Sequence, residues 1–295
     1  MTELTYPDGS VFGIDFADVG HAYNVCVKTK DGSWTQPVPT HGVTTPLSKT
    51  VDKPFIAPWV AKISVHEVLA WCYNNPSRLA EVPQMFADLE RMEAKDKSMT
   101  YYKFTKTYPW LKNLKATYKN SAQEGRDDGD WFHHAVQKFL NDGTNPTTDP
   151  KTALMWKSFI EFYNFYKPKT DSTEFLVYSR TWGYSGAGDW RGEINGKYVI
   201  LDWKTTNRSD SNKDGISFDN FYQLGGLAQA EYERTGKWVD DVGIVNIDKE
   251  GGEAVIIMGS DWGMSPEECA KRYITHLAAY KQQVSDDYKF GKRNV

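Results

Sequence analysis

The order of apolar and polar positions along the chain predicts a protein of helices and strands in alternation. Residues 5–50 are rich in Gly, Pro, Thr and Val, with turn signals at residues 7–9 and 30–32, so we expect short strands joined by hairpins. Helices are predicted over residues 58–89, with a break near Asn75-Pro76, from the glycines at 125 and 129 to about 140, and over 152–166. Further along, the pattern predicts strands over about 174–182, 185–194 and 197–204, a helix over 219–235, strands over 240–247 and 253–258, and a helix over 265–284.

This succession predicts a mixed α/β (α+β) fold in which helices flank a central mixed sheet. The first part of the chain has the pattern of an addition to that core. We therefore expect an N-terminal elaboration over residues 1–121 and a core over residues 122–295.

Composition excludes several classes of protein. The 295 residues are 40% hydrophobic and 25% charged, which is ordinary for a globular chain. Cys26, Cys72 and Cys269 are odd in number and far apart, which argues against a disulfide framework, a zinc ribbon and an iron–sulfur cluster. No apolar run approaches the ~18 residues of a membrane span, and residues 1–4 do not begin a secretion signal. We expect a cytoplasmic protein with no membrane partner.

The net charge of −4 excludes a general polycation, so binding of nucleic acid would require a local basic surface. Residues 97–119 contain six lysines, no acid, and several interleaved aromatic residues. This segment is either an amphipathic helix with its aromatic residues in a core or a surface where lysines contact phosphates and rings stack on bases. The candidate DNA contacts are Lys103, Lys106, Lys112, Lys115 and Lys119.

The segment from residue 184 to 206 carries the most chemistry. Asn195-Gly196 between two strand-like runs is a strong signal for a two-residue hairpin turn, and this turn sets Asp189 directly opposite Asp202. Lys204 then lies on the same face. Two opposed carboxylates with a nearby lysine are typical of a Mg²⁺ or Mn²⁺ site, and the alternative is a surface hairpin with a salt bridge.

These residues resemble the motifs of the PD-(D/E)xK nuclease superfamily, in its RecB-like and phage exonuclease branch. The Gly186-x-x-Asp189 and Asp202-x-Lys204 motifs fit the two strands of the family's hairpin, and Gly129-x-x-x-His133 fits its upstream helix. Glu174 stands where the family often has a glutamate, Tyr222-Gln223 stands near its downstream helix motif, and residues 38–47 and 52–59 are similar to the opening of phage-encoded nucleases.

The resemblance implies a restriction-endonuclease-like core and the activity of a metal-dependent deoxyribonuclease. The form it favours is an exonuclease of phage type that acts in DNA recombination, repair or replication. Asp189, Asp202, His133 and the Trp203 carbonyl would hold one or two Mg²⁺ or Mn²⁺ ions, with Glu174 as a weaker contact. The implied catalytic residues are Asp189, Asp202, Lys204 and Gln223, and Tyr222 would contact DNA. Linear DNA is the implied substrate, and an annealing or recombination protein is an implied partner.

Several alternatives stay open at this stage. The tyrosine of the family's helix motif falls on Leu227, which puts Gln223 in doubt, and Gln223 is otherwise a solvated helix residue. His133 has the alternative of a half-buried helix histidine, and Glu174 that of a polar strand start. The same core also fits an endonuclease, or a nuclease-like DNA-binding or inhibitor protein without turnover.

Overall fold

The structure is a computed structural model that describes the chain except residues 18–21, 53–55, 96–99, 110, 207–215 and 290–295. The side chains of residues 53–59, 95–103, 110–122 and 288–295 are also outside the description. The chain divides into two units, one of residues 1–52 with 129–295 and one of residues 53–128. None of the described helices has the length and apolar composition of a membrane span.

The larger unit is built on a sheet with the strand order β1-β2-β3-β4-β6-β7-β8-β9, to which β5 adds by pairing with β6. The β4–β6 and β7–β8 pairs are parallel, and the other pairs are antiparallel. The expected central mixed sheet is therefore confirmed. Its strands are β1 (Thr2–Thr5), β2 (Val11–Ala17), β3 (Ala22–Val27), β4 (Val38–Gly42), β5 (Lys169–Ser179), β6 (Tyr184–Ile194), β7 (Lys197–Thr206), β8 (Asp241–Asp248) and β9 (Val255–Met258).

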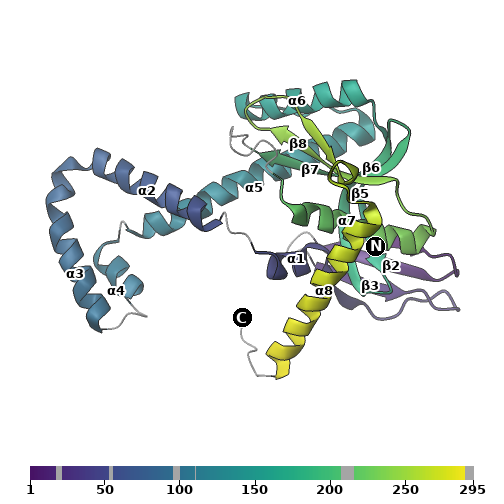
Figure 1. The fold of residues 1–295 in the computed structure, drawn as a ribbon, viewed down its shortest axis with the longest axis horizontal. Coiled ribbons are helices and arrows are strands. Elements are labelled where there is room, and N and C mark those ends of the chain that lie inside the picture. Colours follow the sequence, from purple (N-terminus) through teal and green to yellow (C-terminus); the bar gives the residue numbers. More distant parts are fainter. Residues whose placement is uncertain (18–21, 53–55, 96–99, 110, 207–215, 290–295) are drawn as a thin grey trace. The chain divides into compact units, whose positions relative to one another are not determined.

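Helices cover both faces of this sheet (Figure 1). Ile200 of β7 packs on one side against α7 (Phe218–Thr235) and α8 (Pro266–Lys289). Its neighbours Val199 and Leu201 pack on the other side against α5 (Leu111–Asp142) and α6 (Pro150–Tyr166). Because successive residues of a strand face opposite sides, this apolar run fills both cores.

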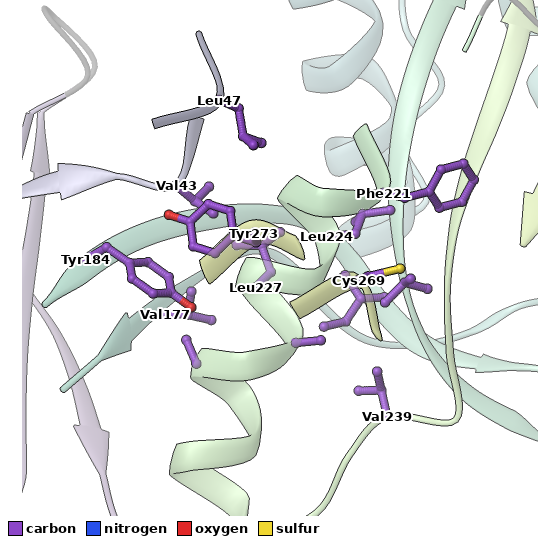
Figure 2. Packing of buried hydrophobic residues seen from close by; sticks show 14 of the residues in the cluster. Val43, Leu47, Val177, Tyr184, Phe221, Leu224, Leu227, Val239, Cys269 and Tyr273 are labelled. Carbon is purple, nitrogen blue, oxygen red and sulfur yellow. The ribbon is translucent and has the colours of Figure 1, made fainter. Parts of the chain in front are cut away.

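The core under α7 and α8 is filled by aromatic and aliphatic side chains from elements distant in sequence (Figure 2). The rings of Tyr184 on β6 and Tyr273 on α8 meet edge to face, with their centroids 4.9 Å apart. The Tyr184 hydroxyl donates to the Gly226 carbonyl of α7 over 2.6 Å. These contacts fix α7 over the sheet, and α7 is the next helix in the chain after the strand that carries the Asp-x-Lys motif.

The first 52 residues fold with the larger unit, which differs from the expected division into 1–121 and 122–295. β4 extends the sheet because His41 and Gly42 pair with Tyr184 and Ser185 of β6, and the short α1 (Thr44–Thr50) follows it. A pairing between strands so far apart in the chain has no local signal in the sequence.

The smaller unit is helical. It contains α2 (Ile56–Asn74), the 3₁₀ helix η1 (Pro76–Glu81), α3 (Val82–Lys95), α4 (Thr100–Thr107) and the first part of α5. The expected break at Asn75-Pro76 separates α2 from η1. Tyr108 joins the segment after α4 to α3 by donating a 2.7 Å hydrogen bond to Asp88.

The local predictions for the hairpin agree with the structure. Asn195 and Gly196 have φ of 50° and 77°, as the two-residue turn requires, and Ile194 pairs with Lys197. Several predicted boundaries differ. β5 begins at Lys169 rather than near 174, α5 runs without a break through Gly125 and Gly129, and α3 and α8 end at Lys95 and Lys289 rather than near 89 and 284.

Candidate metal and catalytic site

The site lies where β6 loses its partner on one edge. On that edge β7 pairs with residues 190–194 and β4 with residues 184–185, so residues 186–189 lie between the two partners. The ladder ends at Trp190 and Leu201, and the next position in the same register puts Asp189 opposite Asp202, as expected. Here the strands separate, and the Trp203 amide donates to Asp189 Oδ2 over 2.8 Å. The Asp189 side chain therefore replaces a strand partner.

Trp203 has the orientation that the strand alternation predicts. Its ring packs on the opposite face of the sheet, 5.7 Å from the Phe159 ring and 6.0 Å from the Phe162 ring. This packing fixes the backbone between Asp202 and Lys204. The role of the Trp203 carbonyl as a metal ligand remains a prediction.

Asp202 and Lys204 form an ion pair, with Lys204 Nζ 2.5 Å from Asp202 Oδ2. The Asp202 side chain is only 7% exposed, and burial, followed by the Asp189 charge, raises the pKa of Asp202 despite the lysine. Burial acts to lower the pKa of Lys204, but the charges of both aspartates raise it overall, so the lysine is cationic at neutral pH. Asp202 Oδ2 is buried, and its partner among the described residues is the Lys204 ammonium, so this oxygen already faces a positive charge in the metal-free fold.

His133 reaches the site from α5. Phe132 before it is fully buried against Phe159, which fixes the rotation of the helix and directs the next side chain to the sheet edge. His133 Nδ1 lies 3.4 Å from Asp189 Oδ2. Burial acts to lower the pKa of His133, but the charges of Asp189 and Asp202 raise it to about 9. His134 is exposed, and its Nδ1 lies 2.7 Å from the Asp130 carbonyl of its own helix.

Glu174 completes the cluster from β5. The pairs Thr173–Trp190 and Phe175–Gly188 flank it, so the same register puts Glu174 opposite Asp189. Its φ of 47° lies in the left-handed region, which is unusual for a residue within a strand. One ligand atom from each of His133, Glu174 and Asp189 lies within 4.8 Å of the others.

This donor set fits a hard divalent cation. Two carboxylates and one imidazole suit Mn²⁺ well, and the carboxylates suit Mg²⁺. The sequence indicated Glu174 only through its position, because a left-handed φ leaves no mark at a glutamate. The structure brings its carboxylate within 4.8 Å of ligand atoms of both Asp189 and His133.

Three residues of α7 lie on two different sides of the helix. Asp219 in its first turn is close enough to raise the pKa of Lys204, and sequence reasoning missed it. Gln223 is four residues further on and shares that helix face, so it faces the same side as Asp219. Tyr222 instead stacks on the His276 ring of α8 at 5.6 Å, with the Arg272 guanidinium 5.9 Å from its ring. The sequence did contain a signal for Asp219: it stands one helical turn before Gln223, in the helix that comes after the Asp-x-Lys strand.

The predicted lysine surface is described only in part. Lys106 is exposed on α4, and the side chains of Lys103, Lys112, Lys115 and Lys119 lie outside the described residues. The role of these lysines in DNA binding stays a prediction.

Comparison with known proteins gives only distant likenesses. No family model matches the chain, and no curated protein matches it. An alkaline exonuclease (LHK-Exo) from Laribacter hongkongensis is 12% identical, with a TM-score of 0.33 over 56% of this chain and 83% of that one. LHK-Exo in complex with dAMP is 14% identical, with a TM-score of 0.31 over 56% of this chain and 83% of that one. SSO0001 is 16% identical, with a TM-score of 0.30 over 60% of this chain and 69% of that one. At TM-scores of this size the likeness carries no argument, and the site is judged on its own geometry.

Proposed function

We propose that this chain is a metal-dependent deoxyribonuclease that hydrolyses phosphodiester bonds, with exonuclease action on linear DNA as the form we favour. The observation that carries the proposal is the meeting of His133, Glu174 and Asp189 within 4.8 Å beside the Asp202–Lys204 ion pair. The resemblance of these residues to the nuclease motifs gives the proposal its substrate class.

His133, Glu174, Asp189 and Asp202 would hold the divalent cation. When bound, Mg²⁺ or Mn²⁺ acidifies a water molecule and neutralises negative charge on the phosphate. Asp189 also accepts the Trp203 amide, so its carboxylate is oriented before any ligand arrives. Such preorganisation avoids the cost of ordering the side chain during the reaction.

Lys204 contributes a positive charge and hydrogen-bond donors. Its pKa is raised, so at neutral pH the Nζ holds its proton. This charge would stabilise the negative charge that develops on the phosphate oxygens. Gln223, which shares a helix face with Asp219, would position the nucleophilic water or the phosphate.

A cleavage assay tests the proposal. The wild type is incubated with linear duplex, single-stranded and closed-circular DNA, each with Mg²⁺, with Mn²⁺ and with EDTA. We expect metal-dependent loss of the linear substrates. The variant D202N should be inactive, and E161Q, which changes an exposed carboxylate of α6, should match the wild type.

The other results each favour a different protein. Nicking of closed circles would favour an endonuclease on the same core. Retarded migration of DNA without cleavage would favour a binding or inhibitor protein. Equal cleavage by the wild type and D202N would contradict the assigned site.

A further inference from the structure

Arg191 on β6 is a cation held inside the larger unit, and the proposed reaction does not use it. Its side chain is 17% exposed. Its Nε donates to Asp171 Oδ2 over 2.8 Å, and its Nη1 donates to Glu231 Oε1 over 2.9 Å. Glu231 on α7 is buried and also accepts from Arg234 Nε over 3.0 Å. Two carboxylates therefore hold the Arg191 guanidinium in one position.

The Arg191 guanidinium lies over the ring of Phe175 on β5, 4.8 Å from the ring centroid, in a cation–π contact. Phe175 in turn covers its cross-strand partner Gly188, because a Cβ on Gly188 would lie 2.4 Å from Cζ of that ring. Phe175 follows Glu174 in the chain, and Gly188 precedes Asp189. The Arg191–Phe175 contact therefore acts on the direct chain neighbours of two residues of the metal cluster.

This contact spans a place where the alternation of β6 reverses. Gly188 faces the α7 side of the sheet, since the Phe175 ring that covers it belongs to the core under α7 and α8. Regular alternation from Gly188 would turn residue 191 to the other side. Arg191 instead contacts Glu231 of α7. The reversal therefore lies within residues 188–191, and Asp189 is part of it.

We propose that Arg191 is a positioning residue of the metal site, which acts through Phe175 to hold the reversal that brings Glu174 and Asp189 to one cation. This inference rests on the proposed function for the cation itself. On β5, the residue opposite Asp189 is Glu174, with its left-handed φ of 47°. A backbone in that region persists only where its surroundings hold it, and the Arg191–Phe175 contact supplies such a hold on the next residue.

Calorimetric titration of the full chain with Mn²⁺, without DNA, tests the inference. R191M removes the guanidinium and keeps a long apolar side chain, and F175L removes the ring and keeps an apolar one. We expect each variant to bind Mn²⁺ about tenfold more weakly than the wild type, as is common when residues behind metal ligands are changed. The double variant R191M/F175L should bind no more weakly than the weaker single variant, because both changes remove the same contact.

The matched control is R234M, which removes the other arginine from the Glu231 carboxylate and leaves the Phe175 contact in place. It should bind Mn²⁺ like the wild type even if it melts at a lower temperature. If Arg191 served the fold alone, R191M and R234M would both melt earlier and both keep the wild-type affinity, which would overturn the inference. Additive losses in the double variant would also overturn it.

The titration separates this inference from the nuclease proposal because it needs no DNA. A wild type that binds Mn²⁺ and leaves DNA intact would contradict the nuclease alone, and a tenfold difference between R191M and R234M would still support the role of Arg191. A wild type that binds no Mn²⁺ would overturn both.

Discussion

At the scale of single residues, the Asp202 carboxylate combines burial with chemistry. Its raised pKa means that its ionised form is held unfavourably in the metal-free fold. We expect D202N to lower cleavage by about 10³-fold or more while leaving the metal-free melting temperature equal or higher. The stability gain should be largest at neutral pH. It should vanish as the pH falls below the folded pKa, where the wild-type carboxyl is already neutral.

The neighbouring lysine gives the opposite stability result. In K204A the buried Asp202 loses its ion-pair partner, and we expect a loss of activity together with about 2 kcal/mol of stability. Calorimetry of both variants without metal, at two pH values, checks this pair. Equal melting temperatures for D202N and K204A would show that the Asp202–Lys204 ion pair does not determine the stability of the metal-free protein in the way predicted for its two members.

Glu174 allows backbone strain and metal binding to be measured separately. Its left-handed φ costs a residue with a Cβ about 1–2 kcal/mol, whereas glycine adopts it freely. We therefore expect E174G to be about 1 kcal/mol more stable than E174A without metal. Both should lose much of the stabilisation by Mn²⁺, because both lack the carboxylate.

E174Q is the control for side-chain shape in this series. It should keep the metal-free stability of the wild type and still bind Mn²⁺ more weakly. Denaturant unfolding of the wild type and the three variants, each with and without Mn²⁺, gives the free energies of unfolding that are compared. If E174A and E174G were equally stable, the left-handed backbone would carry no measurable strain.

At the scale of elements, the packing of α7 on α8 depends on a glycine. A Cβ on Gly225 would lie 2.2 Å from the backbone carbon of Cys269, and backbone cannot yield as a flexible side chain does. We expect G225A to lose about 1–3 kcal/mol of stability. G125A is the control: a Cβ at that position of α5 meets open space, so alanine should stabilise its helix by about 0.5–1 kcal/mol. Thermal unfolding of the two variants should therefore shift in opposite directions.

The elements of the site differed in how well the sequence predicted them. The hairpin was predictable because its register follows from two turn residues, Asn195 and Gly196, that are adjacent in the chain. The position of Glu174 opposite Asp189 was harder to predict, because it depends on the pairing of β5 with β6 and on the left-handed φ of Glu174. The continuity of α5 was also hidden, since Gly125 and Gly129 weaken a helix locally and tertiary packing decides the outcome.

At the scale of the whole molecule, metal binding should stabilise the larger unit. A ligand that binds only the native state adds about 2.7 kcal/mol at a hundredfold excess over Kd. We expect the melting temperature of the wild type to rise with Mn²⁺ and that of D189A to rise much less, because Asp189 belongs to the ligand cluster. E161Q should respond like the wild type. The same rise in D189A as in the wild type would place the bound metal elsewhere.

The last prediction concerns how an acidic protein holds a polyanion. The chain has a net charge of −4, so DNA binding needs a local basic surface, and residues 97–119 are its longest acid-free basic stretch. Replacing Lys112, Lys115 and Lys119 with alanine should flatten the slope of log K against log salt by roughly 2 for single strands, from about 0.7 per lost phosphate contact.

Because these lysines are remote in sequence from the Asp-x-Lys hairpin, the loss should raise KM and leave turnover at saturating DNA nearly unchanged. The matched control replaces Lys151, Lys157 and Lys271 in the larger unit, which removes the same charge from another surface. If charge alone mattered, both triple variants would lose the same slope. If residues 97–119 line the DNA path, the first variant loses about 2 and the second stays near the wild type. An unchanged slope in the first variant would move the DNA path to a different surface.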